Sequence, residues 1–174
     1  MLSPRELKAP DALRWYAVYV RSHCEKKVTE SLEGKGYPAF SPFYRIRRKR
    51  ADRTKEIVLP LFPGYVFCKF DPALRLPVLT TPGIVKIVGA SNEPEPVDEV
   101  EILSLQTAMK SDRAVQPWPY LREGQQVRIL AGGLTGVVGR LLKVKNDCHL
   151  VLSITMLQRS VAVDVDRDSV IPIS

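Results

Sequence analysis

The spacing of apolar and polar positions changes in character along this chain of 174 residues. Residues 15–20, Trp-Tyr-Ala-Val-Tyr-Val, are aromatic, β-branched or small and predict a strand. In the polar stretch that follows, Val28 and Leu32 stand one helical turn apart, which predicts a helix over 23–33 with one face turned inward. Further strands are expected at 37–46, 65–70 and 84–88, and a second long helix at 99–110. The first two thirds of the chain therefore predict the α+β class, an antiparallel sheet with flanking helices.

Polar residues mark the expected helix starts. Ser22 and Glu25 have the spacing of a capping box, in which Ser22 caps the helix and Glu25 reaches back. Asp98 precedes the second long helix in the same way, and Asp71 precedes a helix that Pro77 should keep short. In the second long helix, the apolar residues at helical spacing are Ile102, Leu105 and Met109.

The last third of the chain has a different pattern. Short runs rich in Val, Ile and Thr alternate with turn signals such as Gly132-Gly133, which is typical of a small all-β barrel, most simply one of five strands. The stretch before it lacks periodicity and contains Pro117-Trp118-Pro119, so it is expected to be a linker. The predicted organisation is an N-terminal tail at 1–14, an α+β domain at 15–110, a linker at 111–121 and a β-barrel domain at 122–174.

The composition is that of a globular protein, with 45% apolar and 26% charged residues. No apolar run approaches the roughly 20 residues of a membrane span, and residues 1–14 lack the apolar segment of a secretory signal. Three scattered cysteines do not suggest a disulfide framework, and Cys68 lies in a strand pattern that suggests a core position. We therefore expect a cytoplasmic protein without a membrane partner.

The net charge of +7 is concentrated in the first part of the chain. The first 70 residues contain 15 Lys and Arg against 7 Asp and Glu, and the densest basic stretch runs from Arg45 to Lys55. Such a localised positive field favours encounters with polyanions, although a solvated hairpin tip would have the same composition.

The chain offers little for catalysis. Its two histidines, His23 and His149, each stand beside a cysteine, but no third group that could orient a Cys–His pair is identifiable. Neighbouring residues also point in different directions, so these pairs are poor candidates for a zinc site. The sequence predicts a protein that is not an enzyme and uses no cofactor and no metal.

Two stretches resemble known modules. Trp15 to Tyr19, the helix bearing Glu25-Lys26-Lys27-Val28, and Leu61-Phe62-Pro63-Gly64-Tyr65-Val66-Phe67 resemble the N-terminal domain of the NusG family of transcription elongation factors. The stretch from Gly124 to Ile129, with the glycines after it, resembles a KOW motif, which has an SH3-like barrel fold. The KOW motif residues are Gly124, Val127, Arg128, Gly133, Gly136 and Gly139.

The resemblance implies a monomeric adaptor for transcription elongation and antitermination. In that family the N-terminal domain binds the clamp helices of the largest RNA polymerase subunit, and the KOW domain recruits a second partner such as Rho or a ribosomal protein. The matching polymerase-binding positions are Tyr19, Phe62, Tyr65 and Phe67. Strand alternation puts Tyr65 and Phe67 on one face, but the pattern alone leaves open whether that face is an interface or the core.

Contact with DNA, upstream of or within the transcription bubble, is the hypothesis for the basic residues. The candidate nucleic-acid-binding residues are Arg21, Lys26, Arg45, Arg47, Arg48, Lys49 and Arg50. A KOW-containing ribosomal or RNA-binding protein is the alternative, because KOW modules also occur in ribosomes and a basic hairpin is compatible with RNA binding.

The barrel sequence departs from housekeeping NusG at 150–154 and 157–163, and here the chain looks closer to specialised RfaH-like paralogues that act on selected operons. RfaH is known for a helical form of this domain. The β-branched residues between 151 and 165 and the glycines before them disfavour helix, so we expect a β-barrel here.

Overall fold

The computed structural model describes residues 13–120, 124–144 and 147–173, whose contacts divide into two compact units. One unit, called the sheet unit here, comprises residues 13–40 and 64–96, and the other, the barrel unit, comprises 41–63 and 97–173. The chain passes between the units near residues 40, 63 and 96, so neither unit is continuous in sequence. Nearly all of the expected N-terminal tail lies outside the described residues.

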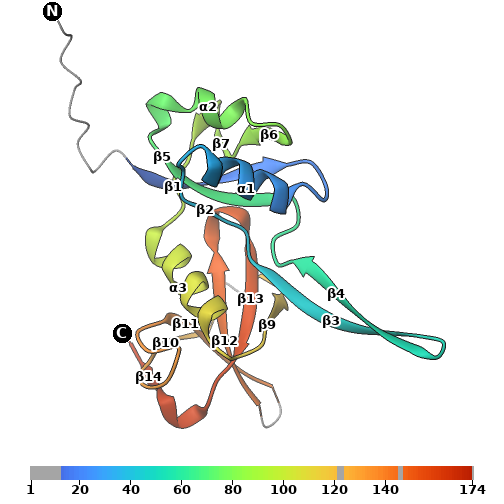
Figure 1. The fold of residues 1–174 in the computed structure, drawn as a ribbon. Coiled ribbons are helices and arrows are strands. Elements are labelled where there is room, and N and C mark those ends of the chain that lie inside the picture. The colour runs from blue at the N-terminus through green and yellow to red at the C-terminus, as the bar shows by residue number, and fades with distance from the viewer. Residues whose placement is uncertain (1–12, 121–123, 145–146, 174) are drawn as a thin grey trace, which may run out of the picture. The chain divides into compact units, whose positions relative to one another are not determined.

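A four-stranded antiparallel sheet in the order β2-β5-β1-β6 forms the sheet unit (Figure 1). The strands are β1 (Arg14–Val20), β2 (Ala39–Phe40), β5 (Tyr65–Phe70) and β6 (Ile84–Ile87). The strand expected at 37–46 is in fact two, because the chain leaves the sheet after Phe40 and starts β3 only at Phe43. Pro42 lies in the break and has no N–H to donate to a ladder.

One face of this sheet builds the apolar core of the unit. Val18 of β1 and Val66 of β5 are paired and fully buried, and they pack with Val28 and Leu32 of α1 (Glu25–Gly34). Val78 of α2 (Leu76–Leu79) completes the same cluster. Helices α1 and α2 therefore cover one face of the sheet, and the apolar spacing that predicted α1 is the spacing that reaches the core.

The start of α1 differs from the expectation. The helix begins at Glu25, with Cys24 at the N-cap position and no side-chain cap, because His23 adopts a left-handed φ of 64° that turns the chain after Ser22. Glu25 is buried, and its carboxylate accepts a hydrogen bond from the backbone N–H of Gly64 at 2.9 Å. The predicted capping box is therefore wrong, since Glu25 contacts a loop distant in sequence instead.

The connection after β5 matches the expected cap at Asp71, but two short elements replace the single short helix that was expected to end before Pro77. Asp71 accepts a hydrogen bond from the N–H of Ala73 and caps the single turn η2 (Pro72–Leu74). Pro77 lies in the first turn of α2, a position that tolerates proline because the N–H there has no helical partner. A small ribbon of β7 (Gly89–Ala90) and β8 (Glu93–Pro94) was not expected. Its turn residues, Ser91 and Asn92, both have positive φ, as two-residue hairpin turns require.

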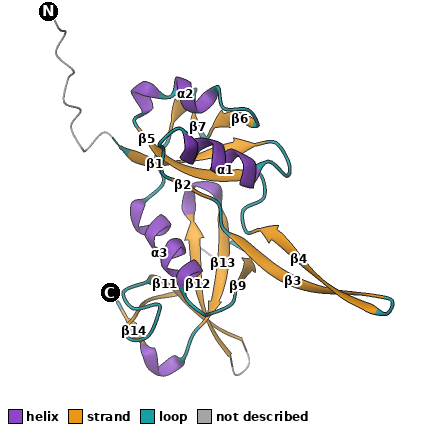
Figure 2. Ribbon diagram, in the orientation of Figure 1, coloured by secondary structure: helices purple, strands orange, loops and turns teal. Residues whose placement is uncertain are grey.

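The barrel unit contains a long hairpin and one long helix (Figure 2). Strands β3 (Phe43–Arg50) and β4 (Arg53–Pro60) pair along their whole length around a turn at Ala51 and Asp52. Helix α3 (Glu99–Lys110) starts as predicted, because Asp98 accepts a hydrogen bond from the N–H of Val100 at 2.9 Å. Ile102 and Leu105 are buried as expected, whereas Met109 is only partly buried.

The rest of the unit is all β. A six-stranded antiparallel sheet has the order β14-β10-β11-β12-β13-β9. Short η3 (Thr155–Leu157) and η4 (Arg167–Ser169) turns join the last strands. The strands are β9 (Val115–Trp118), β10 (Gln125–Ile129), β11 (Val138–Val144), β12 (Asp147–Ile154), β13 (Arg159–Asp164) and β14 (Val170–Pro172).

The five strands expected after residue 122 are present, and the β form expected for 151–165 is the one observed. Strand β9 is an addition, since it uses residues assigned above to a linker. It is the last strand in the order, and such an edge position tolerates Pro117. No helix among the described residues has the length and apolarity needed to cross a membrane.

Candidate interaction surfaces

The second face of the four-stranded sheet is aromatic. Directly paired residues share a face and neighbours along a strand alternate. Tyr19 pairs with Tyr65 and Ala17 with Phe67, so these residues lie on the face opposite Val18 and Val66. Phe40 of β2 pairs with Phe67 and continues the row. The aromatic face consists of Trp15, Tyr19, Phe40, Tyr65 and Phe67.

Two tyrosines form the most accessible part of this face. The rings of Tyr19 and Tyr65 lie with centroids 5.6 Å apart, and Tyr19 remains 40% exposed. Gly64 supports the pair, because its φ of +84° brings the chain close to the Tyr19 ring, where a Cβ would lie 3.2 Å from Cε2. The Glu25 carboxylate accepts a hydrogen bond from the N–H of Gly64, and the carbonyl of Gly64 accepts one from the N–H of Val20. These two bonds hold the backbone of Gly64 in place just before β5.

The four residues predicted from the sequence to contact polymerase differ in their location and in how deeply they are buried. Tyr19, Tyr65 and Phe67 are together on the aromatic face, as strand alternation predicts. Phe67 is fully buried and stacks on Phe40 with centroids 6.2 Å apart. Phe62 is also buried but belongs to the barrel unit and not to this sheet. An accessible role therefore fits Tyr19 and Tyr65 best, whereas truncating Phe67 would also cost stability.

Sequence reasoning left Trp15 and Phe40 out of this set. Trp15 could have been found, because it stands four residues before Tyr19 on the same strand and therefore on the same face. Phe40 could not, since its place depends on β2 pairing with the middle of β5, which the local pattern does not indicate.

The candidate nucleic-acid-binding residues fall into two groups. Arg21, just after β1, and Lys26 of α1 are exposed on the sheet unit. The five cations from Arg45 to Arg50 are exposed on β3 of the barrel unit. Arg45 forms an exposed ion pair with Glu56 at 3.0 Å, which is worth little energetically.

The KOW motif residues frame the turn between β10 and β11. Val127 of β10 is buried and Arg128 beside it is exposed, which is ordinary strand alternation. The carbonyl of Gly124 accepts a hydrogen bond from Nη1 of Arg140 at 3.0 Å, joining the start of β10 to β11.

The three following glycines have different roles. Gly136 has a φ of +85° and open space where a side chain would be. Gly139 has no unusual φ, but a Cβ there would lie 2.8 Å from the carbonyl oxygen of Val151. Gly133 has neither feature, with Ser111 Cβ at 3.5 Å as its nearest neighbour. Positive φ is thus the feature of Gly136, and close backbone approach is the feature of Gly139.

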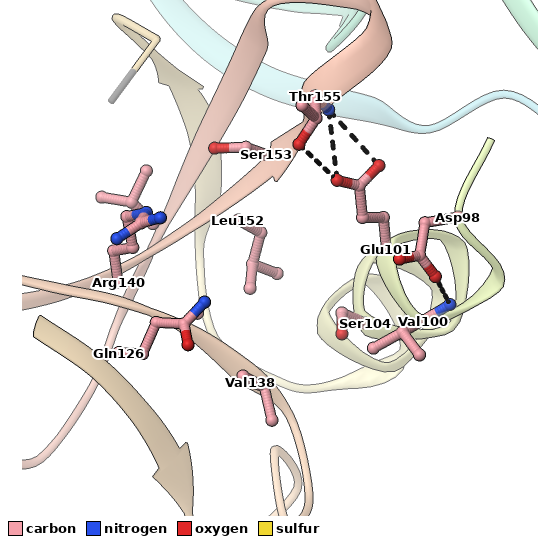
Figure 3. Close-up of a pocket in the computed structure, with 12 residues that line it drawn as sticks. Asp98, Val100, Glu101, Ser104, Gln126, Val138, Arg140, Leu152, Ser153 and Thr155 are labelled. Atoms are coloured by element: carbon pink, nitrogen blue, oxygen red, sulfur yellow. Dashed lines mark hydrogen bonds between the residues drawn. The ribbon is translucent and has the colours of Figure 1, made fainter. Parts of the chain in front are cut away.

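A cavity of about 220 Å³ lies within the barrel unit between α3 and strands β10, β11 and β12 (Figure 3). Glu101 of α3 points across it, and its carboxylate accepts hydrogen bonds from Oγ1 of Thr155 at 2.6 Å and from the Thr155 N–H at 3.2 Å. Burial raises the pKa of Glu101, although the Thr155 hydrogen bonds oppose the shift. Thr155 therefore engages the Glu101 carboxylate, and this pair joins α3 to the end of β12.

The cysteines and histidines do not form nucleophile–base pairs in the described residues. Cys68 is fully buried in the sheet core, as predicted, and burial raises the pKa of its thiol to about 12. His149 bonds Asp164 through Nδ1 at 2.7 Å and lies against the ring of Trp118, with centroids 5.3 Å apart. Among the described residues, no group of His, Cys, Asp and Glu could hold a metal ion.

Comparison with known proteins gives consistent matches over most of the chain. A family model described as "Transcription termination factor nusG" matches residues 13–106. The chain is 28% identical to the transcription termination/antitermination protein NusG of Thermus thermophilus, with 92% of this chain and 98% of that protein covered. It is also 28% identical to the NusG of Staphylococcus carnosus, over 91% and 95% of the two chains.

A solved structure shares the fold. The structure titled "Domain interaction in Thermotoga maritima NusG" aligns with a TM-score of 0.50 and 20% identity, covering 93% of this chain and 98% of that one. This likeness supports the α+β sheet followed by an all-β region that the sequence predicted.

Proposed function

Because the chain belongs to the NusG family, we propose that it is a transcription termination/antitermination factor that binds RNA polymerase through the aromatic face of its sheet unit. The observation that carries this proposal is the pair of accessible tyrosines, Tyr19 and Tyr65, on a sheet whose other face is covered by α1 and α2. Aromatic residues in a partly exposed apolar patch are typical anchors of protein interfaces.

The family resemblance also suggests which part of the polymerase this face contacts. We propose the clamp helices of the largest polymerase subunit, because the family resemblance covers the strand at 15–20 and the segment that ends in β5. The tyrosine hydroxyls can bind polar groups at the edge of such a contact while the rings bury apolar area.

Binding to purified RNA polymerase tests the proposal directly. Tyr19→Ala combined with Tyr65→Ala should weaken binding about 30-fold or more, as expected for loss of about 2 kcal/mol at a central anchor. Leu76→Ala is the matched control, because Leu76 is 68% exposed on α2, on the helical side of the sheet, and its truncation should leave binding unchanged. Circular dichroism of each variant confirms that the fold is intact.

Two outcomes would contradict the proposal. Normal polymerase binding by the folded tyrosine variant would exclude the aromatic face. Enrichment of ribosomal particles instead of polymerase, when the tagged chain is isolated from cells, would support the alternative of a ribosomal or RNA-binding protein.

Membership of the NusG family also suggests a second protein partner, a DNA contact and a choice of target genes. We propose that the barrel recruits a second protein, such as Rho or a ribosomal protein, and that cations of the β3–β4 hairpin, together with Arg21 and Lys26, contact non-template or upstream DNA. The departures at 150–154 and 157–163 support a role on selected operons. Mapping the chromosomal sites occupied by the factor tests that role, since uniform occupancy of all transcribed genes would contradict it.

A further inference from the structure

The register of the β3–β4 hairpin sorts its charges onto two different faces. Paired residues share a face, and the pairs alternate from one face to the other along the ribbon. The pairs Arg48–Lys55 and Arg50–Arg53 alternate with Arg47–Glu56 and Lys49–Thr54. The first face, called the Arg48 face, carries Arg48, Arg50, Arg53 and Lys55, and the opposite face carries Arg45, Arg47, Lys49, Thr54, Glu56 and Val58.

The two faces differ in how their charge is compensated. On the opposite face Glu56 is paired with Arg45, which leaves a net charge of +2 from three cations and one acid. The Arg48 face has four cations and no acid, and all four side chains are exposed. None of the four has an ion-pair partner among the residues that the structure describes. Asp52 lies in the turn, outside both sets of pairs.

The four cations of the Arg48 face destabilise the hairpin when no anion is bound to it. Arg48 stands directly opposite Lys55 and Arg50 directly opposite Arg53, and like charges in that position are destabilising. Residues two apart on a strand lie about 7 Å apart and cross-strand partners about 5 Å apart, so four positive charges share a patch of roughly those dimensions. A polyanion that binds the patch replaces this repulsion by attraction.

The chemistry of the patch also indicates which part of a nucleic acid it contacts. Proteins that hold unpaired bases usually stack them on aromatic side chains. The aromatic residue on this face is Tyr44, which lies towards the base of the hairpin, with Ile46 between it and Arg48. Phosphates are the commonest partners of guanidinium and ammonium groups on nucleic acid, and contacts to phosphates carry no sequence information.

We propose that the Arg48 face of the hairpin binds the phosphodiester backbone of nucleic acid without reading its sequence. This inference rests on the proposed function and names the contacting residues. It adds Arg53 and Lys55 of the returning strand to the candidates, and it assigns Arg45, Arg47 and Lys49 to the face that does not make the contact.

Two variants with equal loss of charge test the proposal in the full chain. Arg48→Ser with Arg50→Ser removes two cations from the Arg48 face, and Arg47→Ser with Lys49→Ser removes two from the opposite face of the same strand. Binding to a 20-base-pair DNA duplex, to single-stranded DNA and to single-stranded RNA is measured over a range of salt concentrations. Each probe is used in two unrelated base sequences.

The Arg48-face variant should flatten the dependence of log K on log salt by about 2 for the duplex and about 1.4 for single strands, since two phosphate contacts are lost. The control variant should keep the wild-type slope. The strongest-binding probe identifies the source of the backbone, and both base sequences should behave alike.

Equal losses in the two variants would show a general charge effect and overturn the assignment, as would a loss limited to one base sequence. Polymerase binding, measured alongside, should be normal in both variants because the aromatic face is unchanged. Wild-type protein that binds nucleic acid through the Arg48 face but does not bind polymerase would refute the proposed function and leave this inference standing.

Discussion

Replacing Gly139 by alanine probes how closely β11 and β12 approach in the barrel unit. The added Cβ would lie 2.8 Å from the carbonyl oxygen of Val151, 2.9 Å from Cδ2 of Leu152 and 3.0 Å from Cδ1 of Leu150. The nearest of these atoms is backbone, and the pairing of Arg140 with Val151 fixes it in the ladder. Overpacking costs about 1–3 kcal/mol, and we expect the upper part of that range because the backbone cannot rotate away.

The two neighbouring glycines of the motif serve as controls. In Gly133→Ala the added Cβ would lie 3.5 Å from Cβ and 3.8 Å from Cα of Ser111, which are ordinary contacts, so the stability of this variant should stay within about 0.5 kcal/mol of the wild type. Gly136→Ala has free space but a φ of +85°. That conformation costs an alanine about 1–2 kcal/mol, partly offset by about 0.4–1 kcal/mol from a less flexible unfolded chain. We expect a net loss of about 1 kcal/mol.

The chain contains a suitable reporter for this series. Trp118 lies in β9 of the barrel unit, and the other tryptophan, Trp15, lies in β1 of the sheet unit. In a Trp15→Phe background, Trp118 fluorescence follows unfolding of the barrel unit during a urea titration. The midpoint and slope give the free energy of unfolding of each variant.

The order of stability is the critical result. Gly139→Ala should be least stable, Gly136→Ala intermediate and Gly133→Ala near the wild type. Equal effects of Gly139→Ala and Gly133→Ala, with unchanged slopes, would refute the reasoning from close approach.

Three further predictions concern buried polar and sulfur groups. Glu25→Ala should destabilise the sheet unit by about 1–3 kcal/mol in a urea titration, because the N–H of Gly64 loses its acceptor, and a wild-type midpoint would contradict this. Cys68 should resist alkylation until the chain unfolds, since burial raises the pKa of its thiol to about 12; rapid labelling of the native protein would show that the strand opens locally. The raised pKa of Glu101 means that the native state binds the carboxyl proton more tightly than the unfolded chain does. The stability that this proton contributes is therefore fully present below the unfolded-state pKa near 4.3 and is lost as pH rises through the native-state pKa. Glu101→Gln should therefore become more stable than the wild type as pH rises through that window, and parallel pH profiles would count against the burial effect.

The local sequence determined most of the secondary structure. Strand β1, the start of α3 at Asp98 and the five strands after residue 122 follow from alternation, helical spacing and caps, which depend on neighbouring residues. The core positions Val28, Leu32 and Cys68 followed from the same periodicities.

Contacts between distant segments decided the rest. The sequence pattern predicts that the Glu25 carboxylate bonds back to Ser22 at the helix start. In the fold, the carboxylate instead accepts a hydrogen bond from the N–H of Gly64 at 2.9 Å. Strand β9 forms from an aperiodic stretch because β13 offers an unpaired edge.

The candidate interaction surfaces also depend partly on the local sequence and partly on the tertiary structure. The family resemblance indicated Tyr19 and Tyr65, and the local charge indicated a run of basic residues. The pairing register placed the tyrosines opposite the helical face and divided the cations of the hairpin between two faces. A shift of register by one residue would reverse every side chain of a strand, and register depends on which residues of a partner strand lie opposite, so only the tertiary structure could decide it.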